Sequence, residues 1–178
     1  MTPVGRPLRL LLPVLLMTTL GACRSPVTTA PQWVPCGTPA CTLLAPAGTR
    51  QEARDDGIDL VHEATAIRLS ARRLLDVERD DDLDGWLDAR HGELALAARW
   101  MQTDAPHGFV VRGISGTLPP PAGVLLDEDP QRVHLVVYEN PRTGHLLALR
   151  LAGPRSRWQE AWPVLSQTLS EVRFGADF

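Results

Sequence analysis

An acidic run near the middle of the chain offers the first candidate chemistry. The carboxylates of Asp80, Asp82 and Asp84 match the first half of a calcium-binding loop, and Asp88 falls at the ninth position of that loop. The twelfth position needs a glutamate that supplies two oxygens, but this chain has His91 there. The run is therefore a weak calcium candidate, and an acidic helix start that binds no metal is the simpler interpretation.

Serine and histidine side chains offer a second candidate chemistry, nucleophilic hydrolysis. Ser115 lies in Gly113-Ile114-Ser115-Gly116, which is one residue short of the glycine–x–serine–x–glycine turn of many hydrolases. His134 lies inside an apolar run, where a hydrogen-bonded core histidine is the simpler interpretation. A catalytic triad is a spatial arrangement, so a hydrolase with an unrecognised triad stays open as an alternative. Because no motif joins these residues, we expect a protein that is not an enzyme.

The amino-terminal residues carry the pattern of an export signal. Arg6 and Arg9 precede an apolar stretch, residues 10–20, that is too short to span a bilayer. The stretch ends in Leu20-Gly21-Ala22-Cys23, which resembles the lipobox of bacterial lipoproteins. The resemblance implies cleavage before Cys23 and acyl chains on that residue, and several chains anchor a protein stably. An ordinary secretory signal followed by a chance cysteine is the alternative.

Sorting and charge bear on where such a protein works. An aspartate directly after the lipidated cysteine resembles an inner-membrane retention signal, and this chain has Arg24 instead, which favours the outer membrane with the domain facing the periplasm. Without residues 1–22 the chain has 16 arginines, no lysine and 21 acidic residues, a net charge of −5. This balance indicates no nucleic-acid partner.

Two further cysteines agree with an exported protein. Cys36 and Cys41 form an even pair, which in an oxidising compartment predicts a disulfide. A redox or metal pair is the alternative, although redox motifs usually separate their cysteines by two residues and no neighbouring ligands complete a zinc set. The pair lies in a stretch rich in proline, serine and threonine, so we expect residues 23–49 to form a lipidated tether with a small disulfide loop.

Residues 50–178 are expected to form a single domain, whose first half is harder to interpret than its second. Residues 58–78 fit both helical and strand periodicity, and the turn signal before Ile58 favours a hairpin followed by a long strand. An apolar stripe from Leu83 to Trp100 predicts one helix. A strand is expected over residues 108–115, and a short one over residues 124–126.

The second half of the domain has clearer signals. Residues 133–138 and 146–151 are rich in strand-forming residues and flank strong turn chemistry at residues 140–144, which predicts a hairpin. Both runs are apolar on both faces, so we expect them in the covered centre of a sheet. Apolar residues spaced by three and four from Trp158 to Val172 predict a closing helix, with Pro163 in its first turn or at a kink.

This order of elements resembles the PsbP-like fold that is shared with DcrB-type bacterial lipoproteins. The layout over residues 50–175 and the ending Ser170-Glu171-Val172-Arg173-Phe174 carry the resemblance. It implies an α+β fold in which helices pack on both faces of an antiparallel sheet, used for binding or assembly and without a conserved active site.

Three functions follow from these expectations. The main hypothesis is a lipid-anchored envelope protein that binds a protein partner or supports an assembly, without a cofactor. The second is an immunity or inhibitor lipoprotein that neutralises a secreted toxin, and the third is the hydrolase. Four tryptophans (Trp86, Trp100, Trp158 and Trp162) are expected to pack in the core, because they recur at helical spacing.

Overall fold

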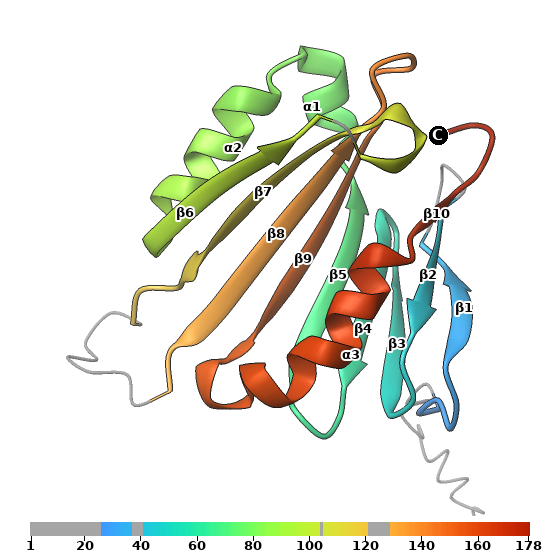
Figure 1. Cartoon of the computed structure of the whole chain (residues 1–178), viewed down its shortest axis with the longest axis vertical. Helices are drawn as coiled ribbons and strands as arrows, with labels where there is room; N and C mark the ends of the chain where they lie inside the picture. The colour runs from blue at the N-terminus through green and yellow to red at the C-terminus, as the bar shows by residue number, and fades with distance from the viewer. Residues whose placement is uncertain (1–25, 37–40, 104, 121–128) are drawn as a thin grey trace, which may run out of the picture.

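The computed structural model describes residues 26–36, 41–103, 105–120 and 129–178, and Figure 1 shows them arranged around a long antiparallel sheet. The strands are β1 (Gln32–Pro35), β2 (Cys41–Ala45), β3 (Thr49–Arg54), β4 (Gly57–His62), β5 (Ile67–Arg73), β6 (Ala95–Gln102), β7 (Val110–Thr117), β8 (Gln131–Glu139), β9 (Leu146–Pro154) and β10 (Arg173–Phe174). The helices are α1 (Leu75–Asp80), α2 (Leu83–Gly92) and α3 (Trp158–Ser170), with 3-10 turns η1 (Pro106–Gly108) and η2 (Arg155–Arg157).

The central hairpin forms from the two apolar runs that the sequence singled out. β8 and β9 pair along their whole length, and the Asn140 side chain closes the turn by accepting the N–H of Arg142 at 2.9 Å. Gly144 in the same turn has a φ of +72°, which glycine adopts without strain. The order β3-β4-β5-β9-β8-β7-β6 places this hairpin inside the sheet, as its two apolar faces predicted.

Alternating side chains divide the domain into two covered faces. On one face Leu69 and Leu149 belong to a core that includes residues of α3 and of the small sheet β1-β2-β10. On the other face Leu135 and Val137 pack with Leu87 of α2. Helices therefore lie on both faces of an antiparallel sheet, which confirms the α+β fold class (Figure 1).

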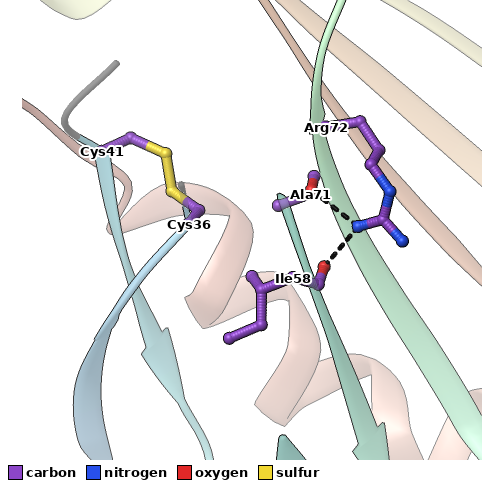
Figure 2. The surroundings of a disulfide bond; sticks show 5 residues. All are labelled: Cys36, Cys41, Ile58, Ala71 and Arg72. Atoms are coloured by element: carbon purple, nitrogen blue, oxygen red, sulfur yellow. Dashed lines mark hydrogen bonds between the residues drawn. A yellow bond between two sulfur atoms is a disulfide. The ribbon is translucent and has the colours of Figure 1, made fainter. Parts of the chain in front are cut away.

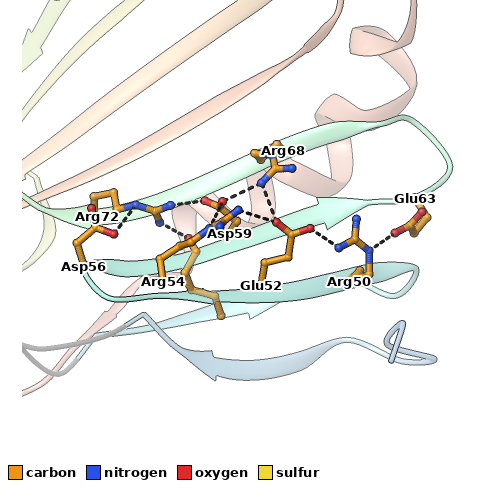
Figure 3. Close-up of polar contacts among 9 residues, drawn as sticks. Arg50, Glu52, Arg54, Asp56, Asp59, Glu63, Arg68 and Arg72 are labelled. Atoms are coloured by element: carbon orange, nitrogen blue, oxygen red, sulfur yellow. Dashed lines mark hydrogen bonds and ion pairs between the residues drawn. The ribbon is translucent and has the colours of Figure 1, made fainter. Parts of the chain in front are cut away.

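The α2 face changes character at its β3–β5 end, where charges replace apolar side chains (Figure 3). Asp59 is buried there and pairs with Arg72 at 2.6 Å, Arg68 at 2.8 Å and Arg54 at 3.1 Å. Burial would raise the pKa of Asp59, but hydrogen bonds from Ser70, Arg72 and Arg54 outweigh it and lower that pKa to about 2. We call the whole group the charge lattice: Arg50, Glu52, Arg54, Asp56, Asp59, Glu63, Arg68 and Arg72.

The predicted tether over residues 23–49 is wrong for the part that the structure describes. β1 and β2 pair with each other, β10 pairs with β2, and Leu43 and Ala45 of β2 are fully buried. The Thr168 hydroxyl of α3 donates a hydrogen bond to the Leu44 carbonyl at 2.8 Å, and Arg173 stacks on Trp33 with its guanidinium 3.6 Å from the ring centre. Proline-rich composition concealed two short strands, which pair with each other and, through β2, with β10 at the other end of the chain.

Cys36 and Cys41 are buried and joined as a disulfide, with their Cα atoms 5.5 Å apart (Figure 2). The Cys36 N–H also donates to the Cys41 carbonyl at 3.0 Å, so this pair closes the hairpin between β1 and β2. The disulfide therefore belongs to the folded core and not to a loop in a tether. Beside it in Figure 2, Arg72 donates from one guanidinium nitrogen to the carbonyls of Ile58 and Ala71, both at 2.8 Å.

The predicted helix over residues 83–100 is only half correct. α2 ends at Gly92, and from Ala95 onward the chain forms β6, the edge strand, whose Leu96 is 89% exposed. The apolar stripe was therefore misleading beyond the first ten residues. Pairing of β6 with β7, which puts Trp100 opposite Gly113, overrides the helical periodicity because tertiary contacts outweigh propensity.

The strand interpretation of residues 58–78 is correct as far as Arg73. β4 and β5 form a hairpin, and β3 precedes β4 in a second one across the predicted turn. The long strand does not continue to Glu78, because α1 begins at Leu75. Glu78 lies on α1 and connects this helix to the sheet: its carboxylate pairs with Arg73 at 2.7 Å and accepts the Leu146 N–H at 2.7 Å.

The closing helix α3 forms where the sequence placed it. Pro163 is its sixth residue, so the prediction of a first-turn position is wrong. The strand predicted over residues 108–115 is β7, displaced by two residues at each end. The short strand predicted over residues 124–126 lies outside the described residues.

Candidate functional site

A hollow rich in aromatic side chains lies between α3 and strands β6, β7 and β8. A cavity of about 390 Å³ is continuous with the aromatic core, and a second hollow of about 360 Å³ adjoins it. Both are lined by His134 and Trp162, so we treat them as one site and call it the α3 cavity. The volume of each hollow falls within the range of about 300–1,000 Å³ that is usual for ligand pockets.

Trp100 forms one wall of the α3 cavity because the neighbouring strand makes room for its ring. A Cβ atom at Gly113 would lie 2.0 Å from the Trp100 indole, so the ring rests directly on the glycine backbone. Trp100 nevertheless stays 39% exposed. The glycine that resembled part of a hydrolase turn therefore has a packing role, which is to seat an aromatic ring on the sheet.

His134 lies at the centre of the site and contacts three side chains. Its Nδ1 atom is 2.6 Å from the Ser115 hydroxyl oxygen, its ring stacks on Trp100 with centroids 6.2 Å apart, and Trp162 meets it edge-on at 5.3 Å. Burial, with a smaller contribution from Arg132, lowers the pKa of His134. The imidazole is therefore neutral at pH 7, which suits an aromatic surface better than a charged one.

α3 supplies the opposite wall through two tryptophans with different surroundings. Trp158 is buried, stacks on Trp162 at 6.0 Å and lies under the guanidinium of Arg132 at 5.2 Å. Trp162 stays 37% exposed at the rim. The expectation that all four tryptophans pack in the core is therefore wrong for Trp100 and Trp162, which face each other across His134.

The inner end of the α3 cavity is apolar. Phe109 meets Phe174 edge-on at 4.7 Å, and Tyr138 lies 5.3 Å from Phe174. The Tyr138 hydroxyl donates to the Leu169 carbonyl at 2.7 Å, and burial raises the pKa of Tyr138 to about 12. No arginine, aspartate or glutamate lines the larger cavity among the described residues, so the site suits an uncharged ligand group.

The contact between Ser115 and His134 is half of a hydrolase arrangement. A catalytic histidine usually needs an acidic partner that orients it and stabilises its charged form. Within the described residues no carboxylate pairs with His134, whose second face meets tryptophan rings instead. The lowered pKa of His134 also weakens it as a base. The described residues therefore supply two members of a triad and not the third.

The four weak calcium candidates do not converge on a metal. Asp82 accepts the Gly85 N–H at 3.0 Å as the cap of α2, whereas Asp84 pairs with Arg112 and Asp88 with Arg99, both at 2.5 Å. Asp80 pairs with Arg79 at 3.0 Å. No cluster of three potential metal ligands occurs in the part of the chain that the structure describes. The acidic run therefore caps a helix and pairs with arginines.

The other residues that the sequence singled out have separate surroundings where the structure describes them. Cys23, the proposed lipidation site, is outside the described residues, and the Cys36–Cys41 disulfide lies beside β10. Of the other histidines, His107 reaches the cavity wall, whereas His62 contacts Thr65 at 2.8 Å. Among the described residues, no helix has the length and apolar character needed to cross a membrane.

Comparisons with known proteins identify the fold. No family model matches the chain, and no curated protein matches its sequence. Cyanobacterial PsbP (CyanoP) from Synechocystis sp. PCC 6803 superposes with a TM-score of 0.54 at 14% identity, over 88% of this chain and 99% of that chain. LpqN, described as involved in cell envelope biogenesis of Mycobacterium tuberculosis, gives 0.52 at 13% identity, over 80% and 90%.

A third structure extends the likeness beyond bacteria. The Ran-binding protein Mog1p of Saccharomyces cerevisiae has a TM-score of 0.50 at 8% identity, over 83% of this chain and 96% of that chain. At such low identities the likeness concerns the fold alone. The chain thus has the α+β fold of PsbP-like and Mog1-like proteins, in agreement with the resemblance seen in its order of elements.

Proposed function

We propose that this chain is a lipid-anchored protein of the cell envelope that binds a protein partner and is not an enzyme. The α3 cavity carries the proposal, because Trp100 and Trp162 stay 39% and 37% exposed beside its larger hollow, which no arginine, aspartate or glutamate lines among the described residues. Tryptophans at the rim of a pocket are the residues that most often dominate binding energy in protein interfaces. The ligand group that fits is a large apolar or aromatic side chain of the partner.

The envelope location rests on the amino-terminal pattern. Lipid on Cys23 would hold the domain at a membrane outside the cytosol, where the Cys36–Cys41 disulfide is stable. Arg24 favours the outer membrane with the domain facing the periplasm. LpqN, which has the same fold, is described as involved in cell envelope biogenesis, and this supports the assignment. Mass spectrometry of the mature amino terminus tests it, and a Cys23→Ser variant that stays membrane-bound and unprocessed like the wild type would contradict it.

Site-specific photocrosslinking of the intact, membrane-anchored protein tests partner binding. A photoreactive amino acid replaces Trp162 in one variant and Leu75 in a matched control, since Leu75 is 57% exposed on α1 at the other face. We expect a protein adduct at position 162 and none at position 75. The crosslinked protein is then purified and titrated against wild type and a Trp100→Ala/Trp162→Ala double variant.

The titration decides whether the α3 cavity is the binding site. Loss of two rim tryptophans is expected to cost about 3 kcal/mol or more, which is over a hundredfold in affinity. Equal crosslinking at both positions, or unchanged affinity of the double variant, would contradict the proposal. If the crosslinked partner is a secreted toxin, the result would favour the hypothesis of an immunity lipoprotein over that of an assembly protein.

A hydrolase is the second candidate, favoured only by the 2.6 Å contact between Ser115 and His134. A fluorophosphonate probe labels a serine whose hydroxyl is activated by a histidine. We expect no labelling of Ser115, with a known serine hydrolase as the positive control. Labelling that a Ser115→Ala variant abolishes would favour the hydrolase over the binding protein.

A further inference from the structure

A second pocket lies on the opposite face of the sheet, between α2 and the charge lattice. It encloses about 320 Å³ and is lined mainly by apolar side chains, among them Trp86, Leu94, Leu118 and Leu135. Arg72, Arg90 and Arg150 bring three positive charges to the lining, and Glu93 brings one negative charge. We call it the α2 pocket. It combines an apolar interior with a concentration of arginine, whereas no arginine lines the larger part of the α3 cavity.

Arg150 has an unusual position for a charged residue. It lies on the interior strand β9, opposite Ser70 of β5 on one side and Leu135 of β8 on the other. Arginines in such half-buried places are normally paired. Arg150 makes no hydrogen bond or ion pair within the described part of the chain. Burial lowers its pKa, and the nearby carboxylate of Glu93 opposes that shift without bonding to it. Its guanidinium therefore offers unused donors to the α2 pocket.

Around the α2 pocket, Arg150 is the arginine that has no carboxylate bonded to it among the described residues. The charge lattice contains four arginines and four carboxylates, all paired with one another. Arg90 pairs with Glu93 and also lies over the Trp86 ring at 5.3 Å. Every other arginine that lines the pocket thus has a carboxylate partner, and one positive charge remains.

We infer that the α2 pocket binds a small amphiphile whose single carboxylate or phosphate group pairs with Arg150. The guanidinium presents parallel N–H donors that match either anion, and such bidentate pairs are stronger than neutral hydrogen bonds. The apolar lining accepts the hydrocarbon part of the ligand. The two pockets lie on opposite faces of the sheet, so this inference does not depend on a partner binding at the α3 cavity.

Photoaffinity labelling of the full-length, membrane-bound protein tests the inference. The probe is a decanoate that carries a diazirine in its alkyl chain, and mass spectrometry locates its adducts. We expect adducts on residues of the α2 pocket, at least tenfold fewer in Arg150→Gln, and wild-type labelling in the control Arg142→Gln. Arg142 is an exposed arginine in the β8–β9 turn without a side-chain partner among the described residues.

Competition separates the ligand's charge from its chain. Unlabelled decanoate or decyl phosphate should suppress labelling, and the stronger competitor identifies the preferred anion. Decanol has the chain without the charge, and acetate has the charge without the chain, so neither should compete at the same concentration. Competition by decanol as strong as that by decanoate, or equal labelling of wild type and Arg150→Gln, would overturn the inference.

A stability measurement guards against a variant that simply misfolds. An unpaired half-buried charge is unfavourable, so Arg150→Met should melt a few degrees higher than wild type while losing the label. Arg150→Lys keeps the charge and should retain more labelling than Arg150→Gln. A lower melting temperature for Arg150→Met would show that Arg150 serves the fold, and this too would overturn the inference.

Discussion

The two ends of the seven-stranded sheet differ in how far their side chains are paired and buried. At the β3–β5 end, polar side chains satisfy one another in the charge lattice, so that Asp59 can be buried without remaining unpaired (Figure 3). At the β6–β8 end, Trp100 and Trp162 stay about one third exposed around a hollow. Charged side chains that already pair with one another contribute to stability, whereas exposed tryptophan rings still have surface that a partner can cover. Substitutions at the first end should therefore change folding, and those at the second should change binding.

The largest effect is expected from Asp59→Asn. Removing the central carboxylate leaves three arginines short of a partner, and breaking a buried ion pair costs about 3 kcal/mol or more. Urea unfolding measures the loss. Asp56→Asn is the matched control, because Asp56 pairs with Arg72 but is 61% exposed, so its loss should stay below about 0.5 kcal/mol. Similar losses in both variants would remove the distinction between the centre and the rim of the lattice.

Acid should weaken the same end of the sheet. Folding lowers the pKa of Asp59 from 3.8 to about 2, so the folded state holds its proton less tightly than the unfolded state. The resulting stability, about 2 kcal/mol, is present above pH 4 and is lost as the pH falls through about 2. Unfolding free energies measured between pH 5 and pH 2 should show this component in the wild type and lack it in Asp59→Asn.

At the other end, Gly113→Ala should disturb the cavity wall. The added methyl group meets the Trp100 indole at 2.0 Å, and such overpacking typically costs about 1–3 kcal/mol unless the ring moves away. We expect a loss near the lower limit, since Trp100 is 39% exposed on an edge strand, together with weaker partner binding. Gly92→Ala provides the control, because nothing lies within 4 Å of its added atom. An unchanged Trp100 environment by fluorescence in Gly113→Ala would contradict this account.

The smallest effect concerns His134. Burial lowers its pKa in the folded state, so the unfolded state binds a proton more readily as the pH falls below about 6.5. Stability should therefore decrease on acidification in that range, and partner binding should weaken as the imidazole becomes charged. His134→Gln should remove this dependence between pH 7 and pH 5.5. A wild-type urea midpoint that is constant over this range would argue against a buried neutral imidazole.

Periodic apolar runs made much of this fold predictable. The β8–β9 hairpin and α3 form at the expected places, because each pattern agrees with local turn chemistry at Asn140 and Gly144 or with a single helical face. The failures lie where strand pairing overrides the local pattern. β1 and β2 pair with each other, β2 also pairs with the distant β10, and β6 pairs with β7, and neither proline content nor apolar spacing reveals these pairings in advance.

The candidate site was only partly visible in the sequence. Ser115 and His134 stood out as residue types that could react, but their contact depends on the register of β7 against β8. Gly113 and Trp100 carried a weak signal, a glycine inside an apolar strand, which often marks a close approach of another group. The order of residues does not predict that Trp162 lies across from Trp100. The two residues are far apart in the chain, and they meet only because α3 packs on the face of the sheet that also carries Trp100.

The sequence by itself determined the export pattern ending at Cys23, the acidic balance, the pairing chemistry of the two other cysteines and the alternation that builds a two-faced sheet. Those properties depend on residue type and short-range spacing. Tertiary structure alone decided which arginines find carboxylates, which tryptophans stay exposed and why Arg150 is left over. The reason is physical: ion pairing and burial depend on distances through space, and strand order, not chain order, sets those distances.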